Sequence, residues 1–209
     1  MPKLHKRPYI LGIACGVLVL GAGTGIAVSQ DRAPSTTEPS KPNAPASAPD
    51  QPLLAAFAVL RRGRDQGDTM PALAVRAVGA GTTTRGGANP TLSRLVARDM
   101  RFSRFALPGA GTLCQVLYSA DEGAGVTCAP EDKVLEAGVT MTVGGEGTDR
   151  VVYGVAPDWV KVVQFRSPSG DTVRTDVVGN GYVATVPAGT RDAVLIGDSQ
   201  SVSFHVVNP

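Results

Sequence analysis

An uncharged, apolar run from Ile10 to Val28, preceded by a short basic head, is the feature that most constrains this chain. Nineteen helical residues at about 1.5 Å each match the roughly 30 Å hydrocarbon thickness of a bilayer, so the run predicts a transmembrane helix. A signal peptide is the alternative, because Ala27 and Ser29 place small residues where a signal peptidase reads the chain. In both cases the remaining residues must fold without this segment.

The charges around the run predict its orientation. Lys3, Lys6 and Arg7 precede it, whereas the thirty residues after it carry only Arg32 and Lys41 as basic residues. The positive-inside rule then keeps residues 1–9 in the cytoplasm and exports the chain after the run. We expect a single-pass membrane protein with an extracytoplasmic C-terminal domain, or a secreted protein if the chain is cleaved after residue 29.

Small residues in the run raise the question of a contact between two copies. Gly12, Gly16, Gly23 and Ala27 share one face of a helix, which would allow a homodimer through the span. Membrane helices also tolerate glycine without any partner, and this is the simpler interpretation.

Residues 29–52 predict a linker rather than a folded element. Six prolines occur among the twenty-two residues from Asp31 to Pro52, together with Ser, Ala and Thr and no large apolar side chain. Such a segment cannot bury a core and is typical of an extended, polyproline-like spacer. The remaining 157 positions, residues 53–209, suit one globular domain with a sizeable core.

Helical spacing marks the first third of this domain, the Arg-rich residues 53–104. Apolar residues recur at helical intervals after Pro52, and Asn89-Pro90 resembles a cap followed by a helix start. In this second predicted helix, residues 90–101, one side carries Leu92, Leu95, Val96 and Met100, and another carries Arg94, Arg98 and Arg101. The Gly- and Thr-rich residues 79–87 predict a surface loop between the two helices.

Residues 105–209 change to a period of two with frequent turn signals, which is typical of antiparallel β structure. The predicted strands are 102–107, 112–119, 125–128, 139–143, 150–155, 160–166, 172–178, 182–186, 193–196 and 201–207. Asn180-Gly181 predicts a tight hairpin turn, and residues 130–137 predict a short helix with Glu131 and Asp132 in its first turn. The predicted fold class is α+β, with short helices packed on an antiparallel β sheet or sandwich.

Two cysteines fit an exported domain. Cys114 and Cys128 are symmetric about Asp121, so a hairpin with its loop there would place them directly opposite each other. Opposed residues lie within the Cα separation that a disulfide accepts. We therefore predict a Cys114–Cys128 disulfide, with two buried free thiols as the alternative.

Residues with catalytic or metal-binding potential are few. His5 lies in the basic head and His205 on the predicted solvated face of the last strand, and no G-x-S-x-G or H-E-x-x-H motif occurs. Residues 144–152 fit one calcium-binding repeat of β-roll proteins, but one copy cannot make the stacked site, so a glycine-rich hairpin loop is expected. We assign no catalytic, cofactor-binding or metal-ligating residue.

The two halves of the predicted domain carry opposite charge. Residues 53–104 hold nine arginines and three aspartates, whereas residues 105–209 hold six basic and twelve acidic residues. The simplest interpretation is that basic helices complement an acidic β region. A functional interpretation is that Arg94, Arg98 and Arg101 bind anionic lipid head groups or phosphate-bearing cell-wall polymers; no nucleic acid is expected as a partner.

Several segments resemble a group of uncharacterised exported proteins of actinobacteria. They are Phe57 to Arg62, Ala88-Asn89-Pro90, the two spaced cysteines and Val152 to Asp158. The resemblance implies a bacterial envelope location and no known activity. The sequence thus predicts a membrane-tethered extracytoplasmic binding or scaffolding module, with a secreted hydrolase using carboxylates near Asp121 or Asp158 as the alternative.

Overall fold

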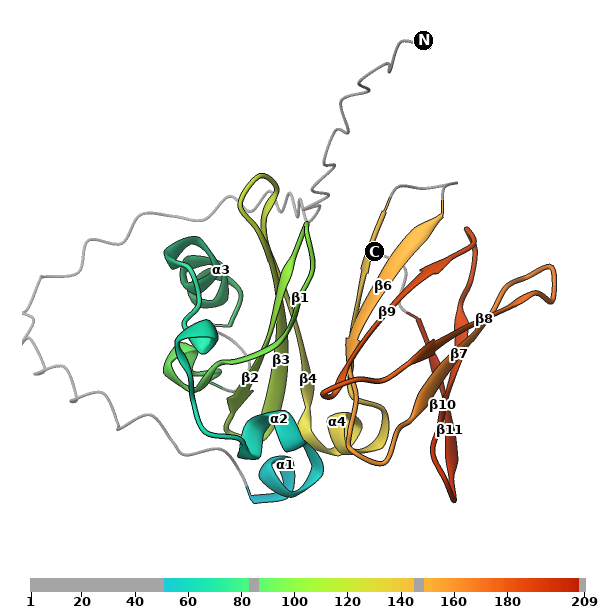
Figure 1. Ribbon diagram of the computed structural model, residues 1–209, viewed down its shortest axis with the longest axis horizontal. Coiled ribbons are helices and arrows are strands. Elements are labelled where there is room, and N and C mark those ends of the chain that lie inside the picture. Colours follow the sequence, from blue (N-terminus) through green and yellow to red (C-terminus); the bar gives the residue numbers. More distant parts are fainter. Residues whose placement is uncertain (1–50, 83–86, 145–148, 207–209) are drawn as a thin grey trace, which may run out of the picture. The chain divides into compact units, whose positions relative to one another are not determined.

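The computed structural model describes residues 51–82, 87–144 and 149–206 (Figure 1). The predicted span, residues 10–28, and the linker up to residue 50 lie outside the described residues. All described residues belong to a single compact unit. Within them, no helix combines the length and the apolar character that crossing a membrane requires.

Sheet A is formed by four strands that follow one another along the chain as antiparallel hairpins. Its strands are β1 (Arg94–Arg98), β2 (Ser103–Gly109), β3 (Thr112–Ser119) and β4 (Gly123–Pro130), in that spatial order. Helix α3 (Ala72–Thr82) covers one face of this sheet (Figure 1). Its Ala74 and Val78 pack there against Phe105, Leu107 and Val116.

The seven remaining strands form a two-layer sandwich of sheets B and C. Sheet B has the order β5 (Val139–Val143), β6 (Arg150–Val155), β9 (Gly181–Val186). Sheet C has the order β11 (Ser201–His205), β10 (Asp192–Ile196), β7 (Val162–Arg166), β8 (Thr172–Asp176). Their facing side chains make one apolar core, with Val152, Tyr182, Phe165 and Leu195 among its members.

The chain moves between the two sheets in the Greek-key order of immunoglobulin-like sandwiches. In that order the first, second and fifth strands share one sheet, and the third, sixth and seventh share the other. Here β5, β6 and β9 form the first group, and β7, β10 and β11 form the second. The fourth strand, β8, departs from this order: it pairs with β7 and so belongs to sheet C, whereas the fourth strand of constant-type immunoglobulin domains lies in the sheet of the first, second and fifth. The expected antiparallel β architecture with a few short helices is therefore confirmed.

Sheet A packs against the outer face of sheet B. Phe102 and Leu117 of the sheet A region contact Tyr153 of β6, and the Phe102 and Tyr153 rings meet edge to face with centroids 5.5 Å apart. Three short helices, α1 (Gln51–Ala56), α2 (Ala58–Arg61) and α4 (Glu131–Ala137), fill the neighbouring space. Their apolar side chains pack on residues of both sheets, including Leu113 and Val155.

Gln115 of β3 is fully buried, and neither its amide nitrogen nor its amide oxygen has a hydrogen-bond partner among the described residues. A buried polar group without a partner costs on the order of 1–3 kcal/mol. We therefore expect Gln115→Leu, which keeps a similar volume, to raise the free energy of unfolding by about 1–3 kcal/mol in urea titrations. A loss of stability would mean that internal water satisfies the amide.

The predicted helix over residues 90–101 is wrong. A single 3₁₀ turn (Pro90–Leu92), capped by the Asn89 side chain, is followed by strand β1. Leu95 packs on the α3 side of sheet A, whereas its neighbour Val96 packs toward α1 and α2. A strand that is covered on both faces carries apolar residues at adjacent positions. In a short segment such residues also fit helical spacing, so the sequence pattern did not distinguish a strand from a helix.

Two other predicted boundaries differ in the structure. Helix α3 was not predicted as a separate helix, and its end, Gly79 to Thr82, lies where a loop was expected; residues 83–86 lie outside the described part of the chain. The tight turn at residues 178–181 has Gly179 and Asn180 as its central residues, both with positive φ, one position before the expected pair. It does not close a hairpin within one sheet, because β8 belongs to sheet C and β9 to sheet B. The helix predicted at residues 130–137 is confirmed as α4.

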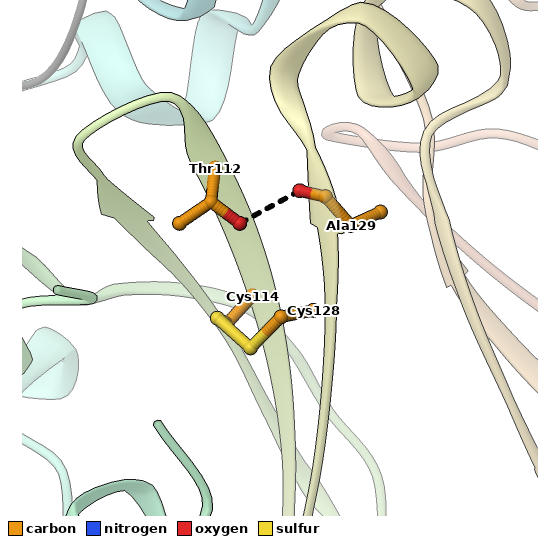
Figure 2. Close-up of a disulfide and its surroundings, with 4 residues drawn as sticks. All are labelled: Thr112, Cys114, Cys128 and Ala129. Atoms are coloured by element: carbon orange, nitrogen blue, oxygen red, sulfur yellow. Dashed lines mark hydrogen bonds between the residues drawn. A yellow bond between two sulfur atoms is a disulfide. The ribbon is translucent and has the colours of Figure 1, made fainter. Parts of the chain in front are cut away.

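The predicted disulfide between Cys114 and Cys128 is confirmed (Figure 2). The two residues are register partners in the β3–β4 hairpin, with Cα atoms 4.0 Å apart. Thr112 Oγ1 donates a hydrogen bond of 2.7 Å to the Ala129 carbonyl beside the bridge (Figure 2). The register of this hairpin follows from its short loop, which centres the pairing on Asp121.

Reducing this disulfide should lower the free energy of unfolding by about 3 kcal/mol, because the bridge restricts a loop of roughly 15 residues in the unfolded chain. The measurement is urea unfolding of the oxidised chain and of the reduced, alkylated chain. Mobility on non-reducing gels verifies the redox state of both samples. Equal unfolding midpoints for the two forms would contradict the prediction.

Candidate functional site

The outer face of sheet C is the strongest candidate for a functional surface. Its strands turn Val163, Phe165, Ala193 and Leu195 into the sandwich core, so the alternate residues point away from it. Strand pairing arranges these outward residues in rows. One row is His205, Asp192, Arg166 and Thr172; the next is Ser203, Val194, Gln164 and Arg174.

Six of these side chains line a hollow of about 330 Å³ on this face, with Ala193 and Phe204 completing its wall: Gln164, Arg166, Asp192, Val194, Ser203 and His205. Pockets that hold small ligands begin at about 300 Å³. The lining mixes a guanidinium group, an imidazole, a carboxylate, an amide and a hydroxyl with one valine. Such a set offers hydrogen bonds to a polar ligand.

Some hydrogen-bonding groups of the hollow already have a partner among the described residues, and others do not. His205 Nδ1 lies 2.9 Å from Asp192 Oδ1, and both side chains are largely exposed. The side chains of Gln164, Arg166 and Ser203 have no hydrogen-bond or ion-pair partner in the part of the chain that the structure describes. These three groups are therefore available to a ligand.

The three arginines of the predicted anionic-ligand patch contact different elements. Arg94 is partly buried and donates to the carbonyls of Arg62, Leu92 and Ser93. Arg98 donates to Ser103 Oγ on the neighbouring strand. Arg101 pairs with Glu122 at 2.6 Å and lies over the Phe102 ring. These contacts tie the three side chains to different partners.

Arg104 has a structural role that its sequence context did not indicate. It is buried on β2, donates from Nη1 to the Tyr182 carbonyl at 2.7 Å and lies over the Tyr153 ring. Burial is the main cause that lowers the pKa of its guanidinium group. These contacts join sheet A to sheet B. Alternation along β2 was the only signal in the sequence that its side chain points inward.

The carboxylates of the β3–β4 turn and those at the start of α4 do not converge. Glu122 pairs with Arg101, while Glu131 and Asp132 lie in the first turn of α4. Asp121 is exposed in the β3–β4 turn. Glycoside hydrolysis needs two carboxyl groups that flank one cleft, and these residues belong to separate hairpin and helix positions.

Asp158 is engaged in a structural network. Its Oδ1 accepts from the Ala58 amide and from Asn180 Nδ2, both at 2.7 Å, and its Oδ2 accepts from Arg61 Nη2 at 2.6 Å. Burial alone would raise the pKa of Asp158, yet these hydrogen bonds bring it below the ordinary value. A general acid needs a raised pKa, so this carboxylate suits capping of α2 rather than proton transfer.

Trp159 is partly buried and packs against the core between sheets B and C. Among the residues that the structure describes, no three potential ligands come together as a metal site. Residues 145–148 of the expected glycine-rich hairpin loop lie outside them.

Comparison of the chain with protein-family models, with curated proteins and with solved structures found no match.

Proposed function

We propose that this protein is a membrane-tethered binding module of the bacterial envelope, with the sandwich displayed outside the cytoplasm. The apolar run and the proline-rich segment supply the tether and the spacer. A disulfide is consistent with an oxidising compartment. The resemblance to exported actinobacterial proteins supports the same location.

One observation carries the binding part of the proposal. The outer face of sheet C presents free polar side chains around a hollow, although the opposite face of the same sheet is buried in the core. A face with available donors and acceptors on a rigid sandwich suits ligand recognition. The alternative is the predicted patch of Arg94, Arg98 and Arg101, for which anionic lipids and phosphate-bearing wall polymers are the expected partners.

The tether is tested by separating membranes from the soluble fraction of cells that express the full chain, followed by N-terminal sequencing. We expect the intact N-terminus in the membrane fraction, and digestion of the domain by protease added outside the cytoplasmic membrane. A soluble chain that starts at Gln30 would contradict the tether. Protection of the domain until the membrane is opened would contradict its export.

Binding is tested by cosedimentation of the detergent-solubilised full chain with purified cell-wall sacculi. A face variant, Gln164→Ala/Arg166→Ala/Ser203→Ala, is compared with an arginine variant, Arg94→Ala/Arg98→Ala/Arg101→Ala. We expect the face variant to lose retention and the arginine variant to keep it. Circular dichroism verifies that both fold. Retention of both variants, or loss only in the arginine variant, would contradict a binding role for sheet C.

A further inference from the structure

We infer that the hollow on sheet C binds a small polar ligand through a carboxylate group, with the Arg166 guanidinium as its anchor. This inference rests on the proposed role of sheet C as the binding face. It adds the chemical class of the ligand and the residue that recognises it.

Arg166 is the available cation of the hollow. It is exposed at the end of β7, and its register partner on β10 is Asp192. Yet Asp192 pairs with His205 on the other side, and no ion pair joins it to Arg166 among the described residues. The planar guanidinium group presents two parallel N–H donors, which match the two oxygens of a carboxylate.

The other lining groups favour a ligand that carries hydrogen-bond donors as well. Gln164 and Ser203 lie in the neighbouring row, and their side chains both donate and accept. Asp192 Oδ2 has no partner among the described residues and accepts only, so it suits a hydroxyl or amide N–H of the ligand. A carboxylate next to such donors occurs in acidic sugars and at the C-terminus of peptides.

The hollow limits the size of the ligand. Its volume of about 330 Å³ lies at the small end of ligand pockets. Val194 supplies the one apolar side chain among the outward residues, against which a sugar ring or a small aliphatic side chain can pack. These dimensions fit one sugar unit or one dipeptide unit, whether free or at the end of a wall polymer.

The test is an NMR titration of the isotopically labelled full chain in detergent micelles. Two acids are used, glucuronic acid and N-acetyl-alanyl-alanine, each with a neutral counterpart, glucose and the dipeptide amide. We expect at least one acid to shift the amide signals of β7, β10 and β11 around the hollow, and its neutral counterpart to bind roughly tenfold more weakly or worse. Which acid binds distinguishes a sugar from a peptide source.

A matched pair of variants assigns the anchor. Arg166→Gln should weaken binding of the acid by roughly tenfold or more. Arg174→Gln changes a cation of the same sheet face, outside the hollow, and should leave the affinity within about twofold. Equal binding of acids and neutral counterparts, equal effects of the two variants, or no shift around the hollow would overturn the inference. The proposed function would still stand in each case if the face variant loses retention on sacculi.

Discussion

Gly154→Ala should destabilise the protein by about 3 kcal/mol or more, because the added methyl group has no space. Gly154 lies in β6 directly opposite Tyr182 of β9, whose ring crosses over it. A Cβ at this position would overlap the Cζ, Cε1 and Oη atoms of Tyr182. The ring cannot swing away, since it is 2% exposed, packs against Phe165 and bonds to Thr140 Oγ1 at 2.8 Å.

Urea unfolding of the full chain in detergent measures this loss. Burial raises the pKa of Tyr182 to about 12. The phenol therefore stays neutral under ordinary buffer conditions, and its ionisation does not affect this measurement. Gly63→Ala is the matched control, because a Cβ there meets nothing within 4 Å; it should change stability by less than about 0.5 kcal/mol.

A double variant tests whether the loss of stability in Gly154→Ala comes from a clash with the Tyr182 ring. Tyr182→Ala leaves a cavity that costs about 3–5 kcal/mol, and the methyl group of Gly154→Ala then extends into that cavity. The combined loss should therefore be smaller than the sum of the two single losses. Additive losses would contradict a clash between residue 154 and the ring.

Asp68→Asn should cost about 3 kcal/mol, because Asp68 is a fully buried carboxylate with four donors. Arg62 donates to both of its oxygens, at 2.9 and 2.5 Å. The backbone amides of Asp65 and Leu95 donate the other two hydrogen bonds, at 2.9 and 2.6 Å. An asparagine would turn its NH₂ group toward some of these donors. The Arg62 side chain is 35% exposed, so water offsets part of its loss and the effect lies at the low end for a buried pair.

Asp65→Asn is the matched control for this prediction. Asp65 also pairs with Arg62, at 3.0 Å, but its side chain is 63% exposed. Exposed ion pairs contribute at most about 1 kcal/mol, so this variant should change stability far less than Asp68→Asn does. Similar losses for the two variants would contradict the importance of burial.

The effect of Asp68→Asn on stability should also depend on pH. Burial alone would raise the pKa of Asp68, but the hydrogen bonds, that from Arg62 foremost, lower it below 3.8. A lowered folded-state pKa stabilises the protein above the unfolded-state value and this contribution is lost as pH falls below it. The stability difference between the wild-type chain and Asp68→Asn should therefore shrink in acid titrations below a pH of about 4.

The sequence predicts structure well where the partners are close along the chain. Residues 112–119 form a strand with the expected bounds, and the pairing of Cys114 with Cys128 follows from a short loop centred on Asp121. A hairpin with a short loop has few alternative registers, and a slip by one residue would expose its apolar face. Helix α4 was predictable for a similar reason, because its helix signals, Glu131 and Asp132, lie within its own first turn.

Distant partners explain what could not be predicted. Nothing near residue 158 in the sequence indicates that Asp158 caps a helix 100 positions earlier, or that Asn180 joins it there. The candidate face on sheet C escaped prediction for a similar reason. Its rows bring together residues of β7, β10 and β11. Strands β7 and β10 are neighbours in sheet C, although the chain between them passes through β9 of sheet B.

Local periodicity and short loops account for the antiparallel β character of the domain, most strand positions and the disulfide, so these features could be predicted from the sequence. Contacts between distant segments account for three other features: residues 94–98 form a strand, the strands divide into three sheets, and Arg166, Gln164 and Ser203 share one face. Local sequence patterns indicate which side of a helix or strand is apolar. Which element covers that side depends on contacts summed over the whole fold, and these also fix the state of segments whose own preference is ambiguous.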